Sequence, residues 1–88
     1  MPTFLATHSL PPNAVTIQQV QRISQMAQQD PVTKGRRSFG NLSEGKVACI
    51  LDAPNREALA AFFERNRRPF DAIVPVEFEG ERGTIRRV

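Results

Sequence analysis

The chain of 88 residues is long enough for one domain, since a protein this short rarely builds two independent hydrophobic cores. Apolar residues make up 40% and charged residues 24% of the sequence, which is typical of folded globular proteins and argues against intrinsic disorder. The longest uninterrupted apolar run, residues 58–63, is far shorter than the roughly 20 residues of a membrane-spanning helix, so we expect no membrane insertion.

The first half of the chain predicts a strand, a helix and a second strand. Residues 3–10 have the apolar content of a strand, and Pro11 ends it because proline cannot donate to a ladder. Thr16 and Gln19 form a Thr-x-x-Gln capping box, which predicts a helix running to about residue 29, before an Asp-Pro pair. Residues 36–42 predict a short second strand.

The second half predicts a strand, a helix and a last strand. Residues 46–51 are almost continuously apolar, as in a strand covered on both faces. Asn55 is a predicted N-cap, and Pro69 forbids continuation of the helix that follows it. Residues 71–78 predict the final strand, at a sheet edge because it contains a proline.

This βαββαβ order predicts a ferredoxin-like α+β fold, with a four-stranded antiparallel sheet and two helices on one face. Residues 1–79 form the predicted domain, and residues 80–88 a mobile or partner-bound C-terminal tail. The middle strand carries apolar side chains toward both faces, Val47, Cys49 and Leu51 toward one and Ala48 and Ile50 toward the other, so one of these sets lies on the face without helices. We therefore expect a second copy to cover that face, in an assembly of the dimeric α+β-barrel type.

His8 and Cys49 are the residues with the most distinctive chemistry. His8, the sole histidine, lies at the end of the first strand, where side chains often face a cleft. It could ligate a metal or act as a general base there, or it could be a surface or turn histidine. Cys49 lies in an apolar run and reads as a buried, inert thiol. As the single cysteine it cannot form an internal disulfide, which favours a reducing, cytoplasmic setting, and no secretory signal opens the chain.

The chain has a formal charge of +3 and a pI near 10.0, and its basic residues lie in three clusters, within residues 34–37, 65–68 and 82–87. Such clusters could bind anionic ligands or form a solvated surface at strand edges and helix ends. An RNA-recognition motif shares this element order, but it stacks bases on aromatic residues of its first and third strands. Residues 46–51 contain no aromatic residue, and the chain has neither Tyr nor Trp. Nucleic acid is therefore an unlikely partner, and a small anionic ligand is the better candidate.

Three segments carry a more specific pattern. A Gly-Lys turn leads into a cysteine-containing strand and an Ala-Pro turn in residues 45–54, Glu-Ala follows in the second helix, and residues 71–76 read Asp-Ala-Ile-Val-Pro-Val. In this pattern the chain resembles a family of small bacterial ferredoxin-like proteins named after an actinobacterial nickel-binding member. The resemblance covers nearly the whole chain, and it implies a ferredoxin-like fold, homo-oligomers and nickel as a candidate cofactor.

The chain departs from that family at the metal-binding positions. Histidine-rich members carry a histidine and an aspartate on the first helix and two histidines on and after the second. An approximate alignment places Ser24, Ala27, Phe63 and Arg67 there, so that His8 is the remaining candidate ligand. Neither phenylalanine nor arginine ligates a cation, so the resemblance implies weak or lost metal binding.

The sequence therefore predicts a small oligomeric protein of the nickel-binding-like family that is not an enzyme. The alternative is a dimeric α+β-barrel protein, or a small enzyme, that binds a small molecule between its helices and sheet. In that alternative His8 supplies the polar group of the pocket, and Phe62 or Phe63 supplies the apolar lining.

Overall fold

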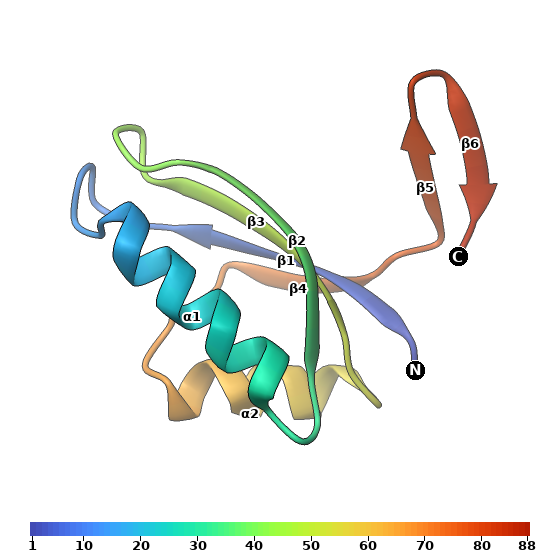
Figure 1. The fold of residues 1–88 in the computed structure, drawn as a ribbon, viewed down its shortest axis with the longest axis horizontal. Coiled ribbons are helices and arrows are strands. Elements are labelled where there is room, and N and C mark those ends of the chain that lie inside the picture. The colour runs from blue at the N-terminus through green and yellow to red at the C-terminus, as the bar shows by residue number, and fades with distance from the viewer.

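Two helices cover one face of a four-stranded antiparallel sheet in the computed structural model, which describes residues 1–88 (Figure 1). This confirms the predicted α+β class. No helix is both long and apolar enough to cross a membrane. The elements in chain order are β1 (Thr3–Ser9), α1 (Ile17–Gln29), β2 (Lys34–Asn41), β3 (Lys46–Asp52), α2 (Arg56–Arg65), β4 (Ala72–Pro75), β5 (Phe78–Glu81) and β6 (Thr84–Arg87).

The sheet has the strand order β2-β3-β1-β4, which places β1 and β3 inside and β2 and β4 at the edges. Leu5 in β1 lies opposite Ile50 of β3 on one side and Val74 of β4 on the other. Successive side chains of a strand alternate between the two faces. Phe4, the neighbour of Leu5, is buried beneath the helices, so Leu5 lies on the face that no helix covers.

Both helices begin at the predicted caps. The Thr16 hydroxyl accepts a hydrogen bond from the Gln19 N–H at 3.2 Å, and the Gln19 side chain accepts one from the Thr16 N–H at 2.8 Å. The Asn55 side chain accepts from the Ala58 N–H at 2.8 Å. These bonds satisfy backbone donors that have no partner inside the helix, which fixes where each helix starts.

The core lies mainly between the sheet and α2, and α1 contributes little to it. Leu59, Phe62 and Phe63 of α2 are buried, whereas the only buried residue of α1 is Ala27. Because the side chain of Ala27 is small, the C-terminal half of α1 lies close to the sheet. The N-terminal half of α1 has no fully buried residue, and a cavity lies beneath it. The nine buried core residues are Phe4, Ala6, Ala27, Leu51, Ala53, Leu59, Phe62, Phe63 and Ile73.

The C-terminal segment differs from its prediction. The last strand of the sheet ends at Pro75, so the predicted continuation to residue 78 is wrong. Residues 80–88, predicted as a tail, belong largely to a hairpin of β5 and β6, and the predicted boundary after residue 79 falls inside β5. Arg82 and Gly83 connect the two strands with φ angles of 48° and 88°. Two consecutive positive φ angles are typical of the tight turns that suit the twist of a hairpin.

Candidate functional site

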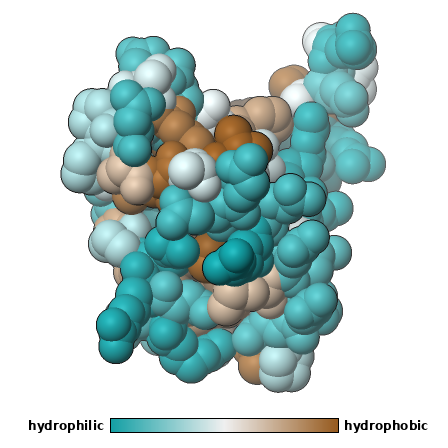
Figure 2. Space-filling view, turned by 60° about the vertical axis from the view of Figure 1, so that its left-hand side comes forward, coloured by the Kyte–Doolittle hydropathy of each residue, from teal (hydrophilic) through white to brown (hydrophobic).

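A cavity of about 90 Å³ lies between α1 and the sheet, under the weakly packed half of that helix. Figure 2 shows hydrophobic side chains gathered on one face of the molecule and surrounded by hydrophilic ones. The walls of the cavity are mostly apolar, with a few polar groups among them. The lining residues are His8, Leu10, Val15, Gln19, Val20, Ile23, Ser24, Ser38, Val47, Cys49, Phe63, Arg68 and Pro69.

His8 is buried and held in one orientation. Its Nδ1 lies 2.8 Å from the carbonyl oxygen of Pro69, and its ring meets that of Phe63 edge-on at 4.8 Å between centroids. A carbonyl oxygen can only accept, so the proton of the neutral imidazole is on Nδ1. This leaves the lone pair on Nε2, which makes no hydrogen bond to the protein.

Arg68 brings a cationic group to the same cavity. Its Nε atom is buried and has no hydrogen-bond partner in the structure. Arg67 has a φ angle of 55°, which reverses the chain after α2, and the Arg68 N–H then donates to the Phe63 carbonyl at 2.8 Å. This turn directs Arg68 back toward the cavity. A buried N–H group without a partner costs about 1–3 kcal/mol, so the site favours a ligand that accepts from it.

Cys49 and Ser38 lie on the sheet side of the cavity. Burial raises the pKa of the Cys49 thiol, and the hydroxyl of Ser38 offsets only part of that increase. The thiol is therefore protonated at neutral pH, which makes it a poor nucleophile and a poor metal ligand.

The structure brings together some of the predicted site residues and separates others. His8 and Phe63 share the cavity, whereas Phe62 lines an adjoining cavity of about 240 Å³ between α1 and the sheet. Ser24, which stands where the resembled family has a ligand, also lines the cavity of His8. Arg68 was not predicted as a site residue. In the sequence Arg68 belongs to a cluster of arginines that is typical of a charged helix end. Nothing in the sequence predicts the turn at Arg67 that redirects it.

The residues present do not assemble a metal centre within one chain. No group of three or more His, Cys, Asp or Glu side chains is placed to hold a metal ion. A protein metal site usually needs three or more protein ligands. His8 as a metal ligand therefore stays a prediction, and any further ligands have to come from outside the chain.

The three predicted arginine clusters are each partly neutralised. Arg36 lies 3.6 Å from Asp52, Arg65 lies 3.0 Å from Asp30, and Arg86 lies 3.4 Å from Glu79. A cation with a carboxylate neighbour attracts a polyanion less strongly than a free one. One arginine of each cluster is therefore partly neutralised by a carboxylate.

Comparison with known proteins places this chain in a family. The crystal structure of SCO4226 from Streptomyces coelicolor A3(2) is similar over 89% of this chain and 99% of that chain, with a TM-score of 0.75 and 20% sequence identity. No curated protein matches the chain. The family model described as nickel responsive protein SCO4226-like matches residues 4–76, which include both helices and the whole four-stranded sheet except the first residue of β1. The chain thus belongs to the SCO4226-like family of nickel responsive proteins.

Proposed function

We propose that this protein binds, without catalysing a reaction, a small molecule with a carboxylate or similar anionic group in the cavity beneath α1. The observation that carries the proposal is the buried Arg68 Nε without a hydrogen-bond partner. An anionic oxygen there would accept a charge-assisted hydrogen bond, which is stronger than a bond between neutral groups. The lone pair on Nε2 of His8 could accept from a hydroxyl of such a ligand, whereas the anionic oxygens would face Arg68.

The walls of the cavity define the rest of the ligand. Val20, Ile23 and Val47 present aliphatic side chains, and Phe63 presents an aromatic ring. A volume of about 90 Å³ fits a short aliphatic chain behind the anionic group. We therefore assign short-chain carboxylates as the class of ligand.

We expect sodium butyrate to shift the imidazole NMR signals of His8, which are unambiguous because the chain has one histidine. Butyramide has the same shape without the charge and should shift them far less. The Arg68→Gln variant should bind butyrate about tenfold more weakly, since it loses the charge-assisted bond. Arg67→Gln is the matched control, because Arg67 is exposed and lies outside the cavity lining. Equal shifts with butyrate and butyramide, or equal weakening by both variants, would contradict the proposal.

Nickel is the second candidate ligand, because the chain belongs to a family of nickel responsive proteins. Imidazole is a suitable nickel ligand, and Nε2 of His8 is free to bind. Phe63 and Ser24 occupy cavity positions where the resemblance implies ligands, and the thiol of Cys49 is protonated. We therefore propose that this chain binds nickel weakly, through His8.

In a calorimetric titration of metal-free protein with NiCl₂, we expect weak binding that does not saturate at equimolar metal. His8→Ala should abolish the heat of nickel binding, since no other imidazole exists in the chain. Ser9→Ala is a suitable control, because Ser9 is the exposed neighbour of His8 at the end of β1. Saturating, stoichiometric binding that survives His8→Ala would show that the metal site lies elsewhere.

We also propose that the protein forms a two-fold symmetric dimer of the ferredoxin-like, dimeric α+β-barrel type. The support is the uncovered sheet face, on which Leu5 and Ile50 are only half-buried and Phe39 and Val74 are exposed. Burial of each such side chain stabilises an interface by up to about 1.5–3 kcal/mol.

Sedimentation velocity should show a dimer at high micromolar concentration. Phe39→Asp should shift the protein toward monomer, since a carboxylate on the buried face lacks a partner. Ile17→Asp on the exposed side of α1 should leave the dimer intact, because 69% of the Ile17 surface is exposed away from the uncovered face. A wild-type monomer at that concentration would contradict the proposed dimer. It would not contradict the proposed binding of a ligand in the cavity beneath α1.

A further inference from the structure

Two consecutive arginines of β2 lie on the sheet face that no helix covers. Successive residues of a strand ordinarily alternate between the two faces. The pairing of β2 with β3 shifts in register between Gly35 and Arg37, so Arg36 is the extra residue of a β-bulge. Arg37 lies opposite Ile50 on the open face, and Arg36 lies 3.6 Å from Asp52, which is two residues from Ile50 and on the same face. β-bulges often redirect side chains beside functional sites, and this one brings two guanidinium groups to one face.

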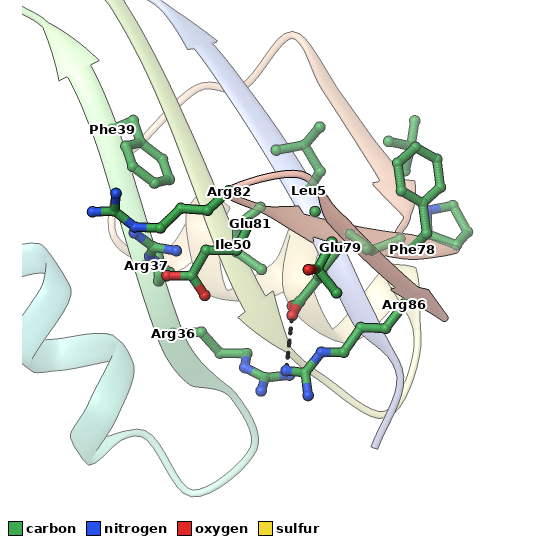
Figure 3. Close-up of a pocket in the computed structure, with 15 residues that line it drawn as sticks. Leu5, Arg36, Arg37, Phe39, Ile50, Phe78, Glu79, Glu81, Arg82 and Arg86 are labelled. Atoms are coloured by element: carbon green, nitrogen blue, oxygen red, sulfur yellow. Dashed lines mark hydrogen bonds and ion pairs between the residues drawn. The ribbon is translucent and has the colours of Figure 1, made fainter. Parts of the chain in front are cut away.

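The open face and the β5–β6 hairpin form the two walls of a groove of about 1090 Å³ (Figure 3). Figure 1 shows the hairpin rising on the side of the sheet opposite the helices. The hairpin register sets Glu79 opposite Arg86 and Glu81 opposite Thr84. These four side chains share one face of the hairpin and line the groove, whereas Ile85 on the other face does not. The hairpin therefore turns its polar side toward the sheet.

The groove carries an excess of positive charge. Its lining contains four arginines and two glutamates, and Glu79 is already paired with Arg86 at 3.4 Å. Arg37 and Arg82 take part in none of the three ion pairs of the chain. Figure 3 shows Arg37 on the sheet wall and Arg82 at the turn of the hairpin, both extending into the space between the walls. Arginine binds phosphate through two parallel hydrogen bonds, so a pair of free guanidinium groups favours a phosphate as the ligand group.

An apolar row crosses the sheet beside these arginines. Ile50 lies opposite Arg37, Leu5 lies opposite Ile50, and Val74 lies opposite Leu5. Neighbouring strands are about 4.8 Å apart, so the aliphatic part of the row extends over about 10 Å from a cationic end. Leu5 and Ile50 are half-buried and Val74 is exposed, so a ligand can contact all three. A flat apolar surface next to a phosphate site suits a planar ring that is joined to a phosphate.

Arg37 is oriented by an aromatic ring before any ligand binds. Its guanidinium group lies over the Phe39 ring at 5.0 Å from the centroid. This cation–π contact uses the face of the guanidinium group and leaves the N–H groups at its edge available to an anion. Less freedom of the Arg37 side chain is then lost when a phosphate binds, which favours affinity.

We propose that this groove binds a nucleoside monophosphate. The phosphate lies between Arg37 and Arg82, and the base lies on the row of Ile50, Leu5 and Val74. The site is on the opposite side of the sheet from the cavity beneath α1 and does not depend on the ligand proposed for that cavity. It shares its face with the proposed dimer, so the nucleotide and a second copy exclude each other.

Methyl NMR with adenosine 5′-monophosphate (AMP) as the probe locates the base. The protein is kept at low concentration, so that a second copy does not cover the face. The ring current of the base should shift the Ile50 methyl signals and leave unchanged those of Ile17, which is exposed on α1. Equal shifts at Ile17 and Ile50, or no shift at Ile50, would overturn the proposal.

Two fragments of the nucleotide separate its parts. Adenosine lacks the phosphate and ribose 5-phosphate lacks the base, and each should bind at least about tenfold more weakly than AMP, because each loses one of the two contacts. Binding of ribose 5-phosphate as tight as that of AMP would overturn the role of the apolar row. Binding of adenosine as tight as that of AMP would overturn the role of the arginines.

Charge variants provide a second, independent readout. Arg37→Gln and Arg82→Gln should each weaken AMP binding about tenfold. Arg22→Gln is the matched control, since it makes the same change of charge at an exposed position of α1. Glu81→Gln should strengthen binding, because Glu81 lines the groove without a cationic partner and repels a phosphate. Equal weakening by the groove variants and by Arg22→Gln would show attraction by overall charge and overturn the site.

A single strand of nucleic acid is the alternative occupant of the groove. Only Arg37 and Arg82 are free of ion pairs among the groove arginines, so few backbone phosphates gain a partner there. We therefore expect a short oligoadenylate to bind within about tenfold of AMP. Binding more than about a hundredfold tighter would show that the groove takes a strand, and it would overturn the proposal of a mononucleotide site.

Discussion

Replacement of Leu59 by alanine is expected to lower the free energy of unfolding by about 3–4 kcal/mol. Leu59 lies in α2 with 0% of its surface exposed, inside the cluster that joins the helix to the sheet. The substitution removes three heavy atoms from a packed site and leaves a cavity that its neighbours refill only in part. Urea or thermal unfolding measures the change. The total free energy of unfolding of a folded domain is about 5–15 kcal/mol, so the expected loss is a large part of it.

Ile17→Ala is the matched control, because isoleucine and leucine are isomers and the same number of atoms is removed. Ile17 is the first residue of α1 and is 69% exposed. We expect a change within about 0.5 kcal/mol, as for most surface substitutions. If both variants lost the same free energy of unfolding, α2 would not be the main contributor to the core. The small number of buried residues on α1 would then need another explanation.

The local features of this fold were predictable from the sequence because their causes lie within a few residues. The capping box at Thr16 and the cap at Asn55 depend on side chains three residues from the backbone groups they bind. Both helices were therefore predicted with their correct starting residues. The end of α2 was less certain, because it stops at Arg65 and only Pro69 marks the limit from the sequence.

The hairpin could not be predicted with the same rules. Hairpin turns with two positive φ angles favour Asn-Gly or Asp-Gly, and this one is Arg82-Gly83. Arginine rarely adopts that conformation, so the dipeptide gives a weak turn signal. Residues 80–88 were therefore predicted as a mobile or partner-bound tail, although Phe78 and Ile85 supply one apolar residue in each strand of the hairpin.

The candidate site was predictable only in part for a related reason. His8 and Phe63 are distinctive residue types, and both line the cavity. Arg68 is one of many arginines in the chain, and only its three-dimensional environment distinguishes it. A buried Nε without a partner is a property of the packing around α2 and cannot be read from residue order.

The second large effect is expected at Asp30, which joins three parts of the chain. One carboxylate oxygen accepts from the N–H groups of Val32 and Thr33 at 2.8 and 2.9 Å, and the other accepts from Arg65 at 3.0 Å. Asp30→Ala removes these three hydrogen bonds and a longer one from the Thr33 hydroxyl at 3.5 Å, all of them between the end of α1, the residues before β2 and the end of α2. We expect a loss of about 2 kcal/mol, mainly from the backbone donors, because Arg65 is largely exposed.

The pH dependence of that loss provides its sharpest test. Partial burial alone would raise the pKa of Asp30, but the Thr33 and Val32 N–H groups and Arg65 outweigh it, so the pKa lies below its ordinary value. A carboxyl with a lowered pKa in the folded state stabilises the protein above its unfolded pKa of about 3.9 and loses that contribution as the pH falls through its folded pKa. Wild type and Asp30→Ala should thus differ fully at pH 7 and converge as the pH falls below the unfolded pKa and through the lower folded pKa.

Glu64→Gln separates this specific effect from a general loss of negative charge. Glu64 is exposed on α2, and its carboxylate makes no hydrogen bond or ion pair. Its substitution should change stability little at either pH, because an exposed carboxylate has nearly the same environment folded and unfolded. A gap between wild type and Asp30→Ala that stayed constant from pH 7 to pH 3 would mean that packing of the side chain, and not its charge, joins α1 to β2 and α2.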